Sequence, residues 1–141
     1  TYRHTEGIDI ELRSNISTKT KEKEEMTDNK NQLREDAIEF AIQISDLCDE
    51  IKGCSVYINQ IVRSSSSIGA NIHEAKYAQS KADFINKLEI SLKECSETEY
   101  WLELLYDANF INETKYNFLY NMNKEIIRII TSILKTARNN L

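Results

Sequence analysis

Apolar residues recur three or four positions apart through most of this chain, and this spacing limits its folding more than any other feature. The first row extends over five helical turns and consists of Leu33, Ala37, Phe40, Ala41, Ile44, Leu47, Cys48 and Ile51. Charged residues such as Asp36 and Glu39 occupy the other positions. Gly53 follows, where a left-handed residue would end a helix. The sequence therefore predicts an amphipathic helix over residues 31–52.

A second row of the same period follows Ser55, which is a candidate N-cap residue. It consists of Ile58, Ile61, Val62, Ser65, Ile68, Gly69, Ile72 and Ala75. Small residues replace bulky ones in its middle, and Gly69 costs a helix interior about 1 kcal/mol relative to alanine. Two interpretations remain open. We favour a close approach between helices across Ser65, Gly69 and Ile72, and the alternative is a functional kink or ligand surface.

Two further helices are indicated, each preceded by a capping residue. Ser80 precedes the third, with Asp83 placed to reach back as a capping-box acid, and Asn112 precedes the fourth. The apolar rows are Phe84, Ile85, Leu88, Leu92, Cys95, Leu102 and Leu105, then Leu119, Met122, Ile126, Ile129, Ile130, Ile133, Leu134 and Ala137. Short links join antiparallel neighbours. We therefore predict an all-α fold, an antiparallel up-down-up-down left-handed four-helix bundle over residues 30–141.

The third helix carries a second row of large or mixed residues beside its core row. This row consists of Ile90, Glu94, Glu97, Trp101 and Leu104. A helix of a lone bundle needs one buried stripe, so large residues beyond it favour a contact with another chain. The alternative, that Trp101 closes the edge of the core, stays open.

Residues 1–29 differ from the rest of the chain because they are polar and include a lysine and glutamate run. A segment with so few apolar residues cannot bury enough surface to offset the conformational entropy that it would lose on folding. We predict a polar N-terminal tail over 1–29, disordered or non-native, in which residues 8–12 alternate as an edge strand would. Met26 is a candidate initiator, which would leave residues 1–25 outside the natural protein. The absence of proline and the presence of only three glycines argue against an all-β sandwich or barrel, which needs many turn residues.

The cysteines and histidines offer little chemistry. Cys48, Cys54 and Cys95 are an odd number without a paired CxxC motif, and no apolar run of about 18 residues is present. We expect a cytoplasmic protein with reduced, inert thiols and no membrane association. The alternative is that these thiols bind a metal or act as nucleophiles. Only two histidines are present to complete such a site.

Known catalytic motifs fail when they are compared with the chain residue by residue. His73 has Ala70 three positions before it, which excludes the Glu-x-x-His pairs of diiron bundles, and Tyr77 stands where HExxH needs its second histidine. The serine run 64–67 lies in no nucleophile elbow. We therefore predict that the protein is not an enzyme and that it has no catalytic, cofactor-binding or metal-binding residues.

Charge separates along the chain. Residues 115–141 contain five basic residues and one acidic residue, whereas residues 31–114 contain seven basic and fifteen acidic residues. The basic row of the last helix has two interpretations. It is either solvated or paired with the acidic helices of a neighbouring subunit, or it contacts nucleic acid. The net charge of −5 favours the first. The candidate nucleic-acid contacts are Arg63, Lys124, Arg128, Lys135 and Arg138.

Three short sequence words carry a family resemblance. They are Ser67-Ile68-x-x-Asn71-Ile72-x-Glu74, Ser80-Lys81-x-Asp83-Phe84 and Glu97-Thr98-Glu99-Tyr100-Trp101-Leu102. Together they resemble the four-helix-bundle family named for the intervening sequences of 23S ribosomal RNA, over residues of about 26 to 141. The resemblance implies a small bundle similar to the family's ring-shaped homopentamers. It also implies a distant relationship to the accessory variability protein of diversity-generating retroelements, which binds RNA and a reverse transcriptase.

The resemblance also selects residues for subunit or bundle geometry. Asn71, Glu74, Tyr100 and Trp101 match the family words, and Leu104 extends the same row. For Asn71 and Glu74 we favour a polar network inside the bundle, since groups three apart share a helix face. The functional hypothesis is a non-enzymatic, self-associating scaffold or adaptor, with a pentamer favoured. The alternative is an RNA-associated accessory protein that binds RNA or a reverse transcriptase through a basic ring surface.

Overall fold

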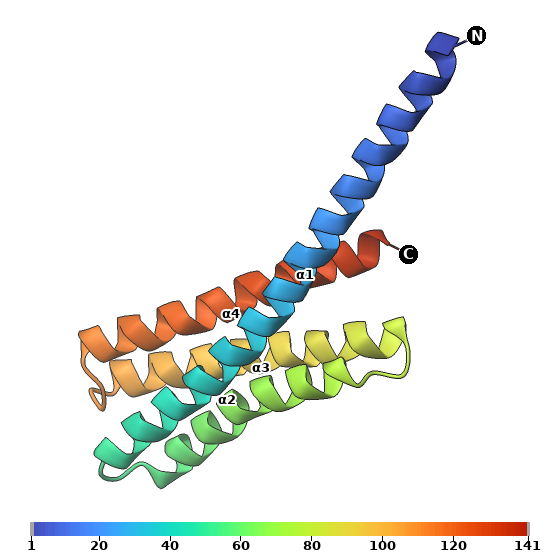
Figure 1. Ribbon diagram of the computed structural model, residues 1–141. Helices are drawn as coiled ribbons and strands as arrows, with labels where there is room; N and C mark the ends of the chain where they lie inside the picture. Colours follow the sequence, from blue (N-terminus) through green and yellow to red (C-terminus); the bar gives the residue numbers. More distant parts are fainter. Residues whose placement is uncertain (1, 141) are drawn as a thin grey trace.

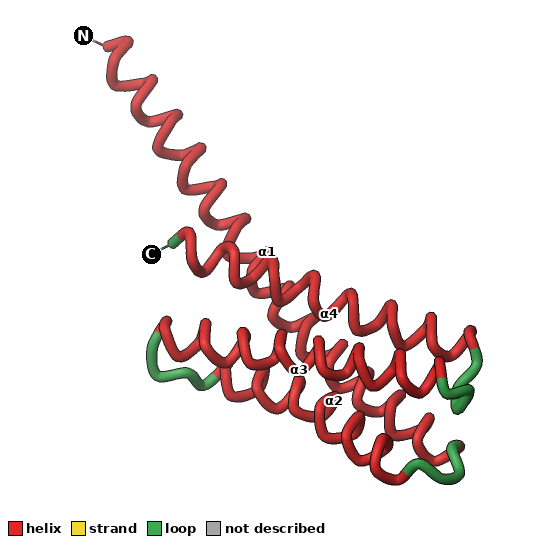
Figure 2. The backbone as a smooth tube through the Cα atoms, turned by 180° about the vertical axis from the view of Figure 1, so that it is seen from behind, coloured by secondary structure: helices red, strands yellow, loops and turns green. Residues whose placement is uncertain are grey.

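Four long helices make up the fold of the computed structural model, which describes the backbone of residues 2–140 and the side chains of residues 6–140. In chain order they are α1 (Tyr2–Glu50), α2 (Ser55–Lys76), α3 (Lys81–Asp107) and α4 (Glu113–Asn139). Each of α2, α3 and α4 packs antiparallel to the helix before it, and α1 closes the bundle against α4 (Figures 1 and 2). In the described part, the backbones of α1 and α3 do not approach each other closely, nor do those of α2 and α4, so these pairs are diagonal. The predicted antiparallel four-helix bundle is confirmed.

The core consists of the predicted apolar rows. Phe40 and Ile44 on α1, Ile61 and Ile68 on α2, and Leu102 on α3 are completely buried. From α4 the row Leu119, Ile126, Ile129, Ile130, Ile133 and Leu134 closes the interior. Burial of one such side chain contributes about 1.5–3 kcal/mol, so these rows determine how the helices face one another.

The first helix is longer than the sequence predicts. Residues 2–29 are not a tail with a strand at residues 8–12: they belong to α1, which projects well beyond the bundle (Figure 1). All side chains from residue 6 to residue 25 are exposed, Met26 is the first partly buried one and Leu33 the first fully buried one. The change from exposed to packed residues therefore occurs near residue 29 without any break in the helix.

Local interactions explain why this segment is helical without burial. The run 19–25 places lysine and glutamate three or four positions apart, a spacing that stabilises a helix. The hydroxyls of Thr18 and Thr20 donate to the carbonyl oxygens four residues earlier, at 2.9 and 2.8 Å. A helix that is already nucleated by its packed part grows at little further cost. We predicted disorder from the small apolar surface alone. That prediction did not consider that the packed part of α1 could extend as a helix toward the N-terminus.

The helix ends match three of the four predicted signals. Gly53 has a φ of 89°, Ser80 Oγ accepts from the Asp83 N–H at 3.0 Å, and Asn112 Oδ1 accepts from the Lys115 N–H at 2.8 Å. Ser55 is not the N-cap of α2. Cys54 takes that position with a φ of 52° and ψ of 38°, because the link 51–54 reverses the chain through two successive left-handed residues.

The small residues of α2 allow close packing, as we favoured from the sequence. Ser64 and Ser65 are buried, and the position of a Cβ atom on Gly69 lies 3.7 Å from the Cβ of Ala37 on α1. Gly69 itself remains partly exposed. The serine segment therefore brings α2 near both α1 and α3.

Candidate functional site

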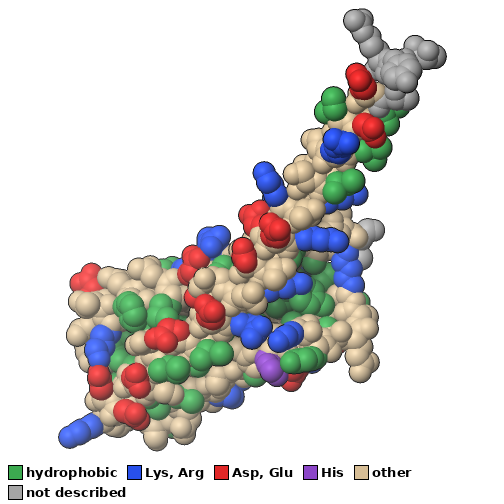
Figure 3. Space-filling model, viewed as in Figure 1, with side chains coloured by type: hydrophobic (Ala, Val, Ile, Leu, Met, Phe, Trp, Pro, Cys, Tyr) green, Lys and Arg blue, Asp and Glu red, His purple; other side chains and the backbone are tan. Residues whose placement is uncertain are grey.

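The outer surface of α1 carries exposed aliphatic side chains within the bundle. Ile38 is 62% exposed and Ile42 is 48% exposed, and their spacing of four places them on one side of the helix. They flank a shallow groove of about 420 Å³ between α1 and α2, whose other wall is made by Ser66, Gly69 and Ala70. We call these five residues the α1 face. In Figure 3, hydrophobic side chains gather between charged ones over α1 and its neighbours.

Sequence reasoning missed Ile38 and Ile42. Both lie outside the core row of the first helix, and the signal that would have found them is their own spacing of four residues. Small residues across the groove leave room for an incoming side chain or helix, since close helix packing uses such residues. The α1 face is therefore suited to protein contact.

An aromatic cluster covers the junction of α2 and α3. Trp101 stacks with Tyr57 of α2, with ring centroids 6.1 Å apart, and meets Tyr100 edge to face at 4.9 Å. Its Nε1 donates to Glu97 Oε1 at 3.3 Å. Trp101 and Leu104 are partly buried, whereas Tyr100 is 55% exposed. We call Tyr57, Tyr100 and Trp101 the aromatic cluster. Tyr100, more than Trp101, presents apolar surface to a neighbour.

Ion pairs connect α3 to the helices on both sides. Between helices they are Arg63 with Glu94 and Glu97, Lys87 with Glu74, Lys124 with Glu99, and Arg138 with Glu89. The Arg63 hydrogen bond holds the pKa of Glu97 below its ordinary value, and the Glu99 hydrogen bond raises the pKa of Lys124. The acidic surface of α3 is thus largely matched by basic residues of the same chain.

This matching affects the five residues predicted to contact nucleic acid. Arg63, Lys124 and Arg138 bind α3 carboxylates, and Arg128 pairs with Glu125 of its own helix at 2.6 Å. Among the described residues, Lys135 alone of the five has no ion pair and is exposed. Lys124 and Arg138 of α4 therefore pair with acidic residues of the same chain, whereas the sequence interpretation placed such pairs between subunits.

Asn71 and Glu74 do not form one network. The Asn71 Nδ2 donates to the Ser67 carbonyl oxygen at 2.9 Å, within the same helix. Glu74 is exposed and pairs with Lys87 of α3 at 2.8 Å, and this hydrogen bond lowers the pKa of Glu74. The predicted polar network that these two residues share inside the bundle is not formed, because Asn71 bonds to its own helix and Glu74 pairs with α3.

A buried polar network does exist elsewhere in the bundle. Thr98 donates to Ser64 Oγ at 2.8 Å, Ser91 donates to the Ile68 carbonyl at 2.9 Å, and Asn123 Nδ2 donates to the Cys95 carbonyl at 2.9 Å. We call Ser64, Ser91, Thr98 and Asn123 the polar seam. These bonds join α2 to α3 and α3 to α4, so the seam fixes how the three helices are aligned.

The thiols of Cys48 and Cys95 lie in environments that suppress reactivity. Burial, together with nearby Glu94, raises the pKa of Cys95 to about 12, and burial with Asp49 raises the pKa of Cys48 to about 11. Within residues 6–140, no group of three or more His, Cys, Asp or Glu side chains is placed to hold a metal ion. None of the described helices combines the length and apolar character needed to cross a membrane.

Comparison with known proteins gives the family. The family model described as 23S rRNA-intervening sequence protein matches residues 15–132. The chain belongs to this family. The resemblance predicted from the three sequence words is confirmed. The match begins eleven residues before the predicted start at 26, so part of the supposed tail, including the lysine and glutamate run, lies within the family pattern. No curated protein matches the chain.

A solved structure extends the comparison for this 23S rRNA-intervening sequence family member. A Bacteroides thetaiotaomicron protein of the S23 ribosomal protein family is 44% identical, with a TM-score of 0.72. The similarity covers 76% of this chain and 98% of that protein, whose function is unknown. Family and neighbour therefore agree on the fold, and neither indicates an enzymatic activity.

Proposed function

We propose that the protein is a non-enzymatic scaffold or adaptor that self-associates through the α1 face and the aromatic cluster. The observation that carries this proposal is the exposure of Ile38 and Ile42 beside a groove of small residues. Isolated soluble chains rarely leave contiguous apolar surface in water. A partner that covered these side chains would gain about 25 cal/mol for each Å² of apolar area removed from water.

Two different patches favour a head-to-tail arrangement. The α1 face lies between α1 and α2, whereas Tyr100 and Trp101 lie at the junction of α2 and α3. A contact between unlike surfaces repeats from copy to copy and closes into a ring when the rotation permits. A ring of five copies, as the family resemblance implies, is our expected assembly.

Native mass measurement of the full chain tests self-association. Ile42→Lys and Tyr100→Lys each place a charge in one patch, and both variants are expected to be monomeric while keeping the wild-type helical signal. Tyr100 is preferred to Trp101 because Trp101 also packs against Tyr57 within the chain. Thr131→Lys on the exposed side of α4 is the matched control and should assemble like the wild type. A monomeric wild-type protein would refute the proposal.

Mixing the two monomeric variants tests the head-to-tail geometry. Each variant keeps one intact patch, so an equimolar mixture should form a dimer of one Ile42→Lys chain and one Tyr100→Lys chain. The dimer should not grow further, because both of its free patches carry the charge. Formation of larger rings in the mixture, or no association at all, would contradict contact between the two unlike patches.

An RNA-associated role remains the alternative hypothesis, and the ion pairs weaken it. Four of its five basic residues already pair with carboxylates, and the net charge is −5. Phosphate contacts would show as an affinity that falls steeply with salt concentration. Retention of a structured RNA that decreases in this way, and that Lys135→Gln and Lys124→Gln reduce, would favour the alternative over the scaffold.

A further inference from the structure

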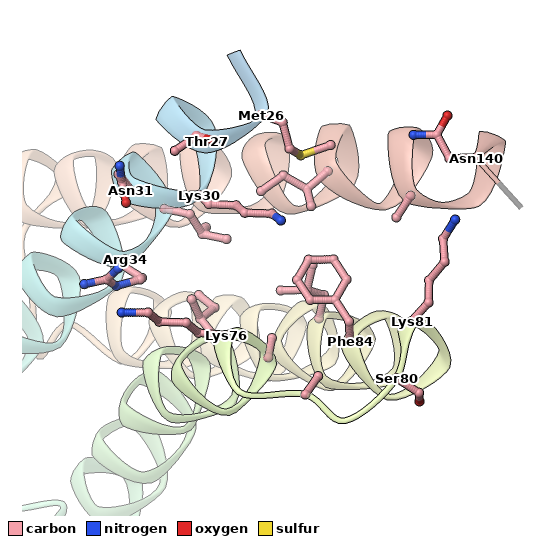
Figure 4. Close-up of a pocket in the computed structure, with 17 residues that line it drawn as sticks. Met26, Thr27, Lys30, Asn31, Arg34, Lys76, Ser80, Lys81, Phe84 and Asn140 are labelled. Carbon is pink, nitrogen blue, oxygen red and sulfur yellow. The ribbon is translucent and has the colours of Figure 1, made fainter. Parts of the chain in front are cut away.

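A pocket opens at the end of the bundle where α1 separates from α2 and α3. Its volume is about 590 Å³, and residues of all four helices line it (Figure 4). Small-molecule sites commonly measure about 300 to 1,000 Å³. None of the residues of the α1 face or the aromatic cluster contributes to this end pocket, so it is separate from the surfaces proposed for self-association.

The interior of the end pocket is apolar. Buried aliphatic side chains from each helix form its floor, namely Leu33, Ile72, Leu88 and Ile133. The ring of Phe84, partly buried, stands in the gap between α3 and α4 (Figure 4). Water in such a space has few hydrogen-bond partners, and an alkyl chain that displaced it would gain the full benefit of apolar burial.

Positive charge surrounds this apolar interior. Lys30, Arg34, Lys76 and Lys81 line the pocket, and no aspartate or glutamate is among its lining residues. These four cations take part in no ion pair within the described part of the chain, unlike Lys124 and Arg138 of α4. In Figure 3, Lys and Arg side chains surround hydrophobic ones where α1 rises from the bundle.

The side chain of Lys30 points into the pocket toward Phe84 (Figure 4). Its Nζ lies 4.8 Å from the centroid of the Phe84 ring, so a cation–π contact is the interaction that holds it there (Figure 4). The carboxylate of Asp83, the residue before Phe84, forms no ion pair with Lys30 among the described residues. It accepts a hydrogen bond from the Gln79 N–H. Two helices, α2 and α4, end here and one, α3, begins here, so the helix dipoles leave a net of about half a negative charge, much less than the four positive side chains. Side-chain charge therefore dominates the local potential.

We propose that the end pocket binds a single-chain amphipathic anion, an alkyl carboxylate, with its chain on the apolar floor. The carboxylate would accept a charge-assisted hydrogen bond from Lys30, which is stronger than a bond between neutral groups, and Arg34 in the lining would add to the positive potential. A ligand with the same alkyl chain and a cationic head group would be repelled by the four positive side chains, and no carboxylate of the lining would offset this repulsion. Charge complementarity thus selects the anion.

Calorimetric titration of the wild-type full chain tests this selectivity directly. Dodecanoate, kept below its micelle concentration, should bind one molecule per chain. Dodecyltrimethylammonium has the same tail and the opposite charge, and it should bind at least about tenfold more weakly. Equal affinity for both compounds, or no binding of dodecanoate, would overturn the proposal. Because this comparison uses the unchanged protein, it does not depend on whether a variant folds.

Variants locate the site. Lys30→Gln combined with Arg34→Gln should weaken dodecanoate binding by about tenfold or more, and Ala137→Leu should weaken it by filling the pocket. Lys93→Gln combined with Lys52→Gln, both exposed and outside the pocket, also removes two positive charges and is the charge-matched control. Unchanged affinity in both pocket variants would overturn the assignment. A structured RNA that binds in place of dodecanoate and is lost with Lys30→Gln and Arg34→Gln would instead assign the cations to nucleic acid.

Discussion

The hydroxyl of Thr98 on α3 donates a hydrogen bond to Oγ of Ser64 on α2, at 2.8 Å, and both residues are completely buried. Thr98→Val keeps the branched shape and removes the donor, so a buried serine oxygen loses its partner. We expect the free energy of unfolding to fall by about 1–2 kcal/mol. Urea unfolding followed by circular dichroism measures this change.

A double-mutant cycle separates this bond from other effects of the substitution. The single hydroxyl hydrogen of Thr98 also lies within reach of the Glu94 carbonyl, at 2.9 Å. Ser64→Ala with Thr98→Val should cost less than the sum of the two single changes, because the bond can be lost only once. Strict additivity would show that the two hydroxyls do not stabilise each other.

Gly69→Ala should stabilise the bundle. The new Cβ would meet only the Cβ of Ala37, at 3.7 Å, which is an ordinary van der Waals contact. Alanine is about 1 kcal/mol better than glycine in a helix interior, so the melting temperature should rise. A lower melting temperature would show that α1 and α2 lie closer than this distance allows. If the ring is lost while stability rises, the groove of the α1 face is part of the interface.

Cys95 should resist alkylation in the folded protein. Burial raises its pKa to about 12 and excludes reagent, so iodoacetamide at pH 8 should modify it only after unfolding. Mass spectrometry of peptides taken over time measures the labelling of each cysteine. Cys54 is the internal comparison because it is only partly buried, and it should be labelled first. Early labelling of Cys95 would mean that α3 and α4 separate readily.

Glu97 should make stability depend on pH in acid. The Arg63 hydrogen bond lowers the pKa of Glu97 from the model-compound value of 4.5, so the folded state favours the ionised carboxylate. Its contribution is complete above pH 4.5 and disappears as the pH falls through the lower folded-state pKa. The pair is partly exposed, so we expect no more than about 1 kcal/mol. Thermal unfolding of wild type and Glu97→Gln should differ at pH 7, and the difference should shrink as the pH falls below 4.5.

The two parts of α1 should exchange amide hydrogens at very different rates. Side chains from residue 6 to residue 25 are exposed, whereas Phe40 and Ile44 are completely buried. A helix segment without tertiary packing opens by fraying, while the packed part opens with the bundle. Hydrogen exchange followed by mass spectrometry should show rapid exchange before Met26 and slow exchange after Leu33. Equal protection would reveal a partner on the projecting segment.

Much of the fold follows from interactions within a few helical turns. The apolar rows predicted the buried faces, and Ser80 and Asn112 were identified as caps because their side chains bond to backbone three residues away. The prediction failed for residues 2–29, because burial of apolar side chains was treated as the only interaction that could keep this segment folded. The projecting part of α1 is stabilised by continuation of a helix, which no count of its apolar residues reveals.

The candidate surfaces were harder to predict, for a physical reason. The bonds of Thr98 with Ser64 and of Arg63 with Glu97 each join residues 34 positions apart, and helical period does not say which polar positions face each other. Trp101 was identified as a candidate contact, but its stacking on Tyr57 depends on how α2 lies against α3. Ile38 and Ile42 became notable only when the packed faces of α1 were known.

The amino-acid sequence by itself determined the four helices, their inward faces, most of their ends and the family, because each depends on residues that are near one another in the chain. Only the tertiary structure decided which charges are paired, where the polar seam lies and where α1 leaves the bundle to open the end pocket. Those features depend on the relative placement of whole helices, which many small packing contacts set together.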